Sequence, residues 1–119
     1  MTKNEKAADV DVLGTSYAVF FQTEDVNPKL RGADGLREIY SHKIIVDPSG
    51  GADELAYENV AEYFRKVLRH EALHAFFAES GLRAYSEDEV LVDFLAMQYS
   101  KLRDLMDTVN KIDIPREAW

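Results

Sequence analysis

Two histidines stand four residues apart in the segment His70-Glu71-Ala72-Leu73-His74. In a helix, residues at this spacing lie on one face, so both imidazoles can point at a single ion without any bend in the backbone. Glu71 projects toward the position that a water molecule on this ion would occupy, where a carboxylate can accept a proton. The segment therefore predicts a site for a divalent metal ion, and zinc is the ion that the pattern favours.

The alternative is that His70 and His74 are partly exposed helix residues that bind nothing. The same segment carries Leu73, Phe76 and Phe77, which places the two histidines close to a hydrophobic core. An accidental occurrence of the pattern in a chain of this length has a chance of roughly one in a few hundred. We therefore favour the metal site.

A catalytic zinc site needs a third protein ligand, and the acidic residues of the next predicted helix supply the candidates. A short connector would fold the two helices roughly antiparallel, which brings Glu89 close to His74. Asp93 lies four residues further on the same face, level with His70, and is expected to accept a hydrogen bond from the outer nitrogen of that histidine. The predicted site comprises the ligands His70, His74 and Glu89, the general base Glu71 and the supporting residue Asp93.

Two alternatives concern the third ligand. Glu89 also occupies the last position of a possible capping box, Ser86-Glu87-Asp88-Glu89, and could cap the helix instead. His42 could complete a site of three histidines, although its place in a predicted tight turn favours the surface. Glu79 follows His74 by five residues and points off the shared face, so it is not expected to be a ligand.

Strand patterns precede the motif. Tyr17, Val19 and Phe21 alternate with other residues, and Leu13-Gly14-Thr15 predicts the turn of a hairpin whose first arm covers about residues 10–12. Two more β-prone runs, residues 36–40 and 43–47, meet at Ser41-His42 and predict a second hairpin. The first half of the chain should therefore form a small antiparallel sheet.

The second half of the chain has the spacing of apolar residues that is typical of helices. From about residue 54 or 57 to residue 80, apolar residues recur every three or four positions, and Gly81 is expected to end this helix. A second helix is expected from Ser86 to about Asn110. Strands followed by helices predict an α+β fold, in which the sheet of two hairpins packs on two main helices. We expect one domain over residues 1–119, with flexible tails at 1–9 and 113–119.

Composition excludes several classes of protein. The chain has 119 residues and 46% hydrophobic residues, enough for one domain with a core. It has no cysteine, which excludes thiolate metal sites, a catalytic cysteine and disulfides. The net charge of −8 and the absence of a basic stripe argue against direct nucleic-acid binding. No apolar run is long enough for a membrane span, and a cytoplasmic protein is expected.

The pattern His70-Glu71-x-x-His74 followed by Glu89-x-x-x-Asp93 resembles the gluzincin family of zinc peptidases. The resemblance implies that His70, His74 and Glu89 bind zinc and that Glu71 is the base, with Asp93 supporting a histidine. In this chain the interval between the second histidine and the later glutamate is shorter than in the large gluzincins, and their second domain is missing.

A closer resemblance is to short proteins encoded by phages and prophages of Gram-positive bacteria. It rests on residues 67–71, 79–82 and 89–93 and extends back to residues 13–17. It implies a compact zincin fold, similar to the minimal gluzincins, with an edge strand of the sheet beside the metal. We expect residues 43–47 to be that strand, able to pair with an extended peptide.

Two functional hypotheses follow. The first is a zinc-dependent metallopeptidase that acts on a protein or peptide substrate in the host cytoplasm. The second is an interaction protein encoded by a phage, in which the metal only stabilises the fold. Glu71 distinguishes them, because a purely structural site has no need of it. No residue is assigned to stabilise an oxyanion, and the available tyrosines are Tyr40, Tyr57, Tyr85 and Tyr99.

Overall fold

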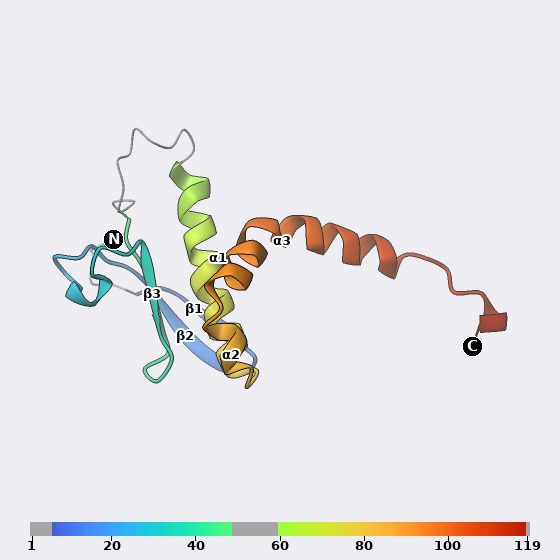
Figure 1. Ribbon diagram of the computed structural model, residues 1–119, viewed down its shortest axis with the longest axis horizontal. Helices are drawn as coiled ribbons and strands as arrows, with labels where there is room; N and C mark the ends of the chain where they lie inside the picture. Colours follow the sequence, from blue (N-terminus) through green and yellow to red (C-terminus); the bar gives the residue numbers. More distant parts are fainter. Residues whose placement is uncertain (1–5, 49–59, 119) are drawn as a thin grey trace.

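The computed structural model describes residues 6–48 and 60–118, and these residues form a four-stranded sheet beside two long helices (Figure 1). The strands are β1 (Lys6–Val12), β2 (Thr15–Phe21), β3 (Gly35–Glu38) and β4 (Lys43–Val46). The helices are α1 (Val60–Glu79), α2 (Arg83–Ser86) and α3 (Glu89–Asn110), with short 3-10 helices at Pro28–Leu30 and Arg116–Ala118. The predicted α+β class is confirmed. Among the described residues, no helix combines the length and the apolarity that crossing a membrane requires.

Both predicted hairpins are present, but the sheet that they form is mixed. β1 pairs with β2 and β3 with β4 in the antiparallel sense, whereas β2 and β4 are parallel. The strand order is β1-β2-β4-β3. After β2 the chain forms β3 at the far edge of the sheet, and β4 then lies between β2 and β3. The expectation that residues 43–47 form an edge strand is therefore wrong, because β4 lies inside the sheet and β1 and β3 are its edges.

Left-handed backbone conformations mark the predicted turns. Leu13 and Gly14, between β1 and β2, have φ angles of 51° and 92°, as a two-residue hairpin turn with the twist of the strands requires. Gly81 has a φ angle of 84° and ends α1, as predicted. The predicted start of this helix, at residue 54 or 57, lies outside the described residues.

The second long helix begins later than predicted. Ser86 is the last residue of α2, and its buried hydroxyl donates a hydrogen bond of 2.8 Å to the carbonyl oxygen of His74. Asp88 is the N-cap of α3, and its side chain accepts a hydrogen bond of 3.0 Å from the backbone N–H of Leu91. The capping box at Ser86 is therefore wrong, because its serine is used to join α2 to α1.

The core lies between α1 and the sheet, with Tyr17, Val19, Ile44 and Ala75 buried in it. The hydroxyl of Tyr17 donates a 2.7 Å hydrogen bond to Glu79, which joins the end of α1 to β2. α3 packs against α1 and then extends away from the body (Figure 1). Residues 6–9 belong to β1, so the expected N-terminal tail is wrong for them, and residues 1–5 lie outside the described residues.

The closest approach of sheet and helix is at Gly35, at the start of β3. A Cβ atom at this position would lie 2.9 Å from Cγ1 of Val67 and 3.1 Å from both Cγ of Glu71 and the carbonyl oxygen of Ile45. Only glycine lets the edge strand lie this close to the helix that carries the motif.

We expect Gly35→Ala to lower the free energy of unfolding by about 1–3 kcal/mol, because the added methyl group overpacks this contact. Val67→Ala removes Cγ1, the atom nearest to the added methyl group. In this background Gly35→Ala should lower the free energy of unfolding by clearly less. Urea unfolding of the two single variants and the double variant measures the coupling. Equal losses in both backgrounds would contradict the close approach.

Candidate metal centre

Three side chains from two helices converge at one point. The Nε2 atoms of His70 and His74 are 3.1 Å apart, and the two carboxylate oxygens of Glu89 lie 2.9 Å from the first and 3.0 Å from the second. In a tetrahedral zinc site with bonds of about 2.0–2.2 Å, neighbouring ligand atoms are separated by roughly 3.3 Å. Only small shifts are needed to place one ion between them. This is the one group of histidine and acidic residues, among those described, whose ligand atoms lie close enough to hold a metal ion.

The helix boundaries explain this convergence. His70 and His74 are one turn apart on α1, and the short α2 turns the chain so that α3 begins beside them. Glu89 is the first residue of α3, directly after the N-cap Asp88, so its side chain is not used as a cap. The capping alternative for Glu89 is thereby excluded, and its carboxylate contacts both histidines.

The outer nitrogen of each histidine faces an acceptor. Nδ1 of His74 contacts the backbone carbonyl oxygen of Ser86, and Nδ1 of His70 lies 3.2 Å from Oδ1 of Asp93. A carbonyl and an ionised carboxylate only accept hydrogen bonds, so in a neutral ring Nδ1 carries the proton and Nε2 presents a lone pair, which is the form that binds a metal ion. Asp93 lies where the sequence analysis expected it, whereas the role of Ser86 was missed.

These tautomers test whether the group fits a metal ion. With both rings neutral, two Nε2 lone pairs and a carboxylate face one another at about 3 Å, and a positive charge among them, from a metal ion or from a proton on an imidazole, stabilises this arrangement. Burial lowers the pKa of His74, which keeps its imidazole in the neutral form that binds metals. The set of nitrogen and oxygen ligands can hold a metal ion, and imidazole nitrogens suit several divalent transition metals.

Glu71 is buried beside this group, on the side of α1 that faces β3. Burial raises its pKa to about 7, although His70 and Arg37 act in the opposite direction. Its Oε1 atom has no hydrogen-bond partner, and the nearest cation is Nη1 of Arg37 at 3.8 Å. A carboxyl group in this environment can both take up and release a proton near neutral pH.

A cavity of about 310 Å³ opens in front of Glu71, and several of its lining residues were not predicted. Tyr63 and Lys66 line it from α1, and Arg37 lines it from the edge strand β3. Lys66 also forms an ion pair of 2.5 Å with Asp93, and this contact is the main reason that the pKa of Asp93 is lowered. Helical spacing could have identified Tyr63 and Lys66, seven and four residues before His70, but nothing in the sequence points to Arg37.

Other residues that the sequence analysis considered lie elsewhere. His42 is exposed in the hairpin turn beside Tyr17, outside the metal-binding group, so the site of three histidines is wrong. Glu79 accepts hydrogen bonds from Thr15 and Tyr17, which agrees with its exclusion as a ligand. The tyrosines Tyr40, Tyr85 and Tyr99 do not line the cavity in front of Glu71, and Tyr57 lies outside the described residues.

The chain matches no protein-family model, no curated protein and no solved structure. Its resemblance to gluzincins and to phage-encoded proteins therefore stays an expectation from the sequence.

We expect His74→Ala to abolish stoichiometric zinc binding, because it removes a buried ligand that no neighbouring residue can replace. Asp93→Ala should weaken binding by about 10- to 100-fold, since it releases the ring of His70. Titration calorimetry and metal analysis measure both effects. Asp107→Ala, an exposed acidic position on the same helix, is the matched control and should bind zinc like the wild type.

A second expectation concerns pH and the metal-free protein. Because the pKa of Glu71 is about 7 in the folded state and near the ordinary glutamate value of 4.5 in the unfolded state, the folded state holds this proton more tightly. The stabilising proton is therefore lost as pH rises through 7. Glutamine cannot ionise, so Glu71→Gln should raise the free energy of unfolding at a pH where the folded protein would have to bury the charged carboxylate. This increase should be up to about 3 kcal/mol larger at pH 8 than at pH 5.

Urea unfolding at the two pH values, in the presence of a chelator, measures this gain. Glu87→Gln, an exposed glutamate, should show no such dependence. A gain for Glu71→Gln that is equal at both pH values would show that Glu71 is not a buried acid.

Proposed function

We propose that this chain is a zinc-dependent metallopeptidase that hydrolyses peptide bonds in a protein or peptide substrate. The observation that carries the proposal is Glu71, a buried carboxyl group whose Oε1 atom has no hydrogen-bond partner, beside three converging ligand atoms. Burying such a group without a hydrogen bond costs about 1–3 kcal/mol, and a metal that only held helices together would not require it. A general base requires this placement.

The residues divide the chemistry among them. His70, His74 and Glu89 would hold the zinc ion, and one position in its coordination shell would stay free of protein ligands. A bound zinc ion acts as a Lewis acid and lowers the pKa of a water molecule. Glu71 would accept the proton of the attacking water and donate it to the departing amine nitrogen, for which a pKa near 7 is suited.

Arg37 supplies positive charge in the same cavity. Its guanidinium is 3.8 Å from the Glu71 carboxylate, and no other ion pair of Arg37 is found among the described residues. When a carbonyl carbon is attacked, negative charge develops on its oxygen, and a nearby fixed cation stabilises that charge. Arg37 is therefore the residue that would stabilise the oxyanion, a role for which the sequence offered only tyrosines as candidates.

The edge strand β3 gives a route for the substrate. It pairs with β4 on one side, and among the described residues no strand pairs with its other side. Gly35 and Arg37 of this strand line the cavity in front of Glu71. A peptide in extended conformation could add to this edge as a further strand, which would bring its backbone past the metal-binding group. This supports a peptide as the substrate.

The alternative is an interaction protein that the metal only stabilises. The exposed apolar side chains along the second half of α3 favour a binding role. Such a role does not explain a buried Glu71, so we rank it second.

We expect the zinc-loaded protein to cleave members of a mixed library of fluorogenic peptides. Glu71→Gln should lower kcat by about 10²- to 10⁴-fold with zinc content unchanged, because only the proton transfer is removed. Glu87→Gln is the matched control and should retain full activity. Full zinc occupancy in the wild type without cleavage of any library peptide would contradict the proposal and favour the structural alternative.

A further inference from the structure

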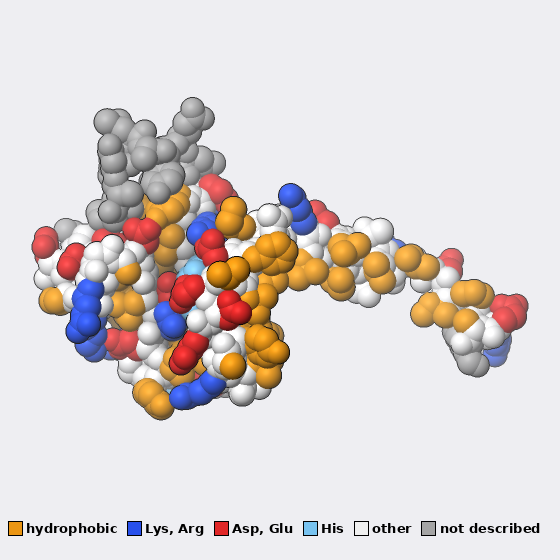
Figure 2. Space-filling model, viewed as in Figure 1, with side chains coloured by type: hydrophobic (Ala, Val, Ile, Leu, Met, Phe, Trp, Pro, Cys, Tyr) orange, Lys and Arg blue, Asp and Glu red, His pale blue; other side chains and the backbone are white. Residues whose placement is uncertain are grey.

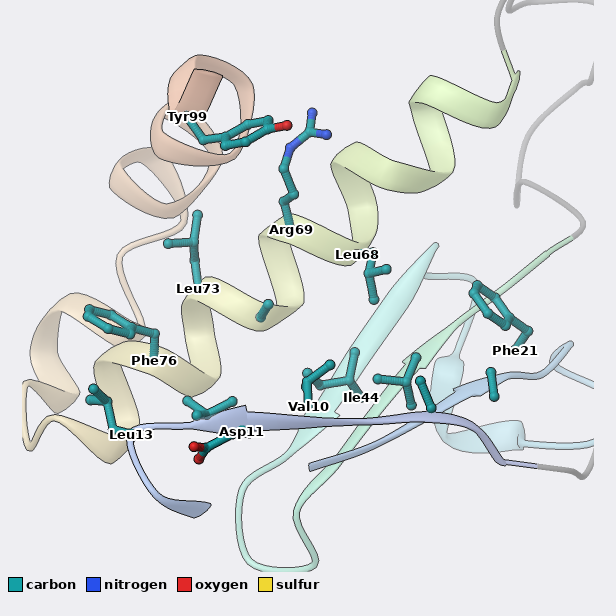
Figure 3. Close-up of a pocket in the computed structure, with 15 residues that line it drawn as sticks. Val10, Asp11, Leu13, Phe21, Ile44, Leu68, Arg69, Leu73, Phe76 and Tyr99 are labelled. Carbon is teal, nitrogen blue, oxygen red and sulfur yellow. The ribbon is translucent and has the colours of Figure 1, made fainter. Parts of the chain in front are cut away.

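An apolar groove lies on the side of α1 away from the metal-binding group. Within the sheet, α1 contacts β3 and β4 more extensively than β1, so the face of the sheet at β1 is only partly covered. The resulting groove has a volume of about 690 Å³ and is bounded by β1, α1 and the middle of α3 (Figure 3). Val10, Leu68, Leu73 and Phe76 form its walls, and Tyr99 stands at its rim.

The second half of α3 carries an apolar stripe with no partner. We name residues 100–112 the arm; residues 101–112 are all exposed, and the arm extends away from the body (Figure 1). Leu102, Leu105, Met106 and Val109 are 45%, 54%, 47% and 48% exposed, and their spacing puts them on one helical face. Figure 2 shows hydrophobic side chains along the arm that continue toward the body.

Such an arm requires a binding partner. A helix in water draws most of its stability from packing its apolar face, and among the described residues the apolar face of the arm stays about half exposed. The groove and the arm form one continuous surface, because a smaller hollow lined by Leu73, Tyr99 and Leu102 connects them, and the first two of these residues also line the groove. Contiguous exposed apolar surface of this extent is unusual for a monomer.

We propose that the arm of one copy binds in the groove of a second copy, and that the reciprocal exchange forms a two-fold dimer. The arm extends away from the body of its own copy (Figure 1), so it does not cover the groove between β1 and α1 of that copy. In a two-fold pair, both unpartnered surfaces of each copy are covered at once and the assembly is closed.

The dimensions agree with this arrangement. β1, which lines the groove, has 7 residues and is about 23 Å long at 3.3 Å per residue. The stripe from Leu102 to Ile112 is about 15 Å long at 1.5 Å per residue, so it fits along the strand. Its half-exposed side chains offer on the order of 400–500 Å², and with the groove surface each copy approaches the roughly 800 Å² of a standard interface.

Charge also favours a second copy. The arm contains three basic residues, Lys101, Arg103 and Lys111, and two acidic residues, Asp104 and Asp107, for a net charge of +1. The whole chain has a net charge of −8, so the remainder carries −9. The arm is therefore attracted to the acidic body of another copy.

The test uses the full chain in analytical ultracentrifugation. We expect the wild type at micromolar concentration to sediment at twice the monomer mass of 13.5 kDa. Leu105→Glu on the arm and Val10→Glu in the groove should each raise the dimer dissociation constant at least 100-fold. Asp107→Ala, on the polar side of the arm, should leave it unchanged. Circular dichroism checks that each variant is folded.

Cysteine cross-linking tests which surfaces meet, because the chain has no cysteine of its own. Under mild oxidation, an equimolar mixture of Leu105→Cys and Val10→Cys should give a disulfide-linked dimer, whereas either variant alone should not. Dimers that cross-link through Leu105→Cys alone would show that arms pair with arms and would overturn the proposal. A wild type that stays monomeric at 100 μM, or a dimer that Val10→Glu leaves intact, would overturn it as well.

Discussion

The convergence of two imidazole nitrogens and one carboxylate is the constraint on which the site depends. The two nitrogens lie 3.1 Å apart and the carboxylate oxygens lie 2.9 Å and 3.0 Å from them, and when both rings are neutral these atoms present only lone pairs to one another. Such a group is stable only when a cation offsets the repulsion or when the surrounding fold holds it in place. The fold does hold it: α1 fixes the spacing of the histidines, and the connector to α3 fixes the carboxylate.

Residues 86–89, where α2 ends and α3 begins, combine several functions. The carbonyl of Ser86 accepts a hydrogen bond from one histidine, and its hydroxyl donates to the backbone of the same residue. Asp88 then caps α3, and Glu89 follows as its first residue. Because the cap fixes where α3 begins, it also fixes the position of the carboxylate. Local backbone chemistry and the geometry of the site are therefore linked at this point.

The sequence predicted features that depend on short-range spacing. The helical face shared by His70 and His74, the two hairpins and the ends of both helices near Gly81 and Asn110 follow from local periodicity and turn residues. The parallel pairing of β2 with β4 could not be predicted, because it depends on which strand fills a gap in the sheet. Arg37 was missed for the same reason, since its place beside Glu71 depends on the edge position of β3.

The sequence distances of these contacts have a consequence for the order of folding. His70 and Glu89 are 19 residues apart, whereas the hydrogen bond from Tyr17 to Glu79 joins residues 62 positions apart. Closing the shorter loop costs less chain entropy. The helical hairpin of α1 and α3 can therefore form before the parallel strands find each other. A metal ion that bound early to this hairpin would hold its two helices together and so template the later steps of assembly.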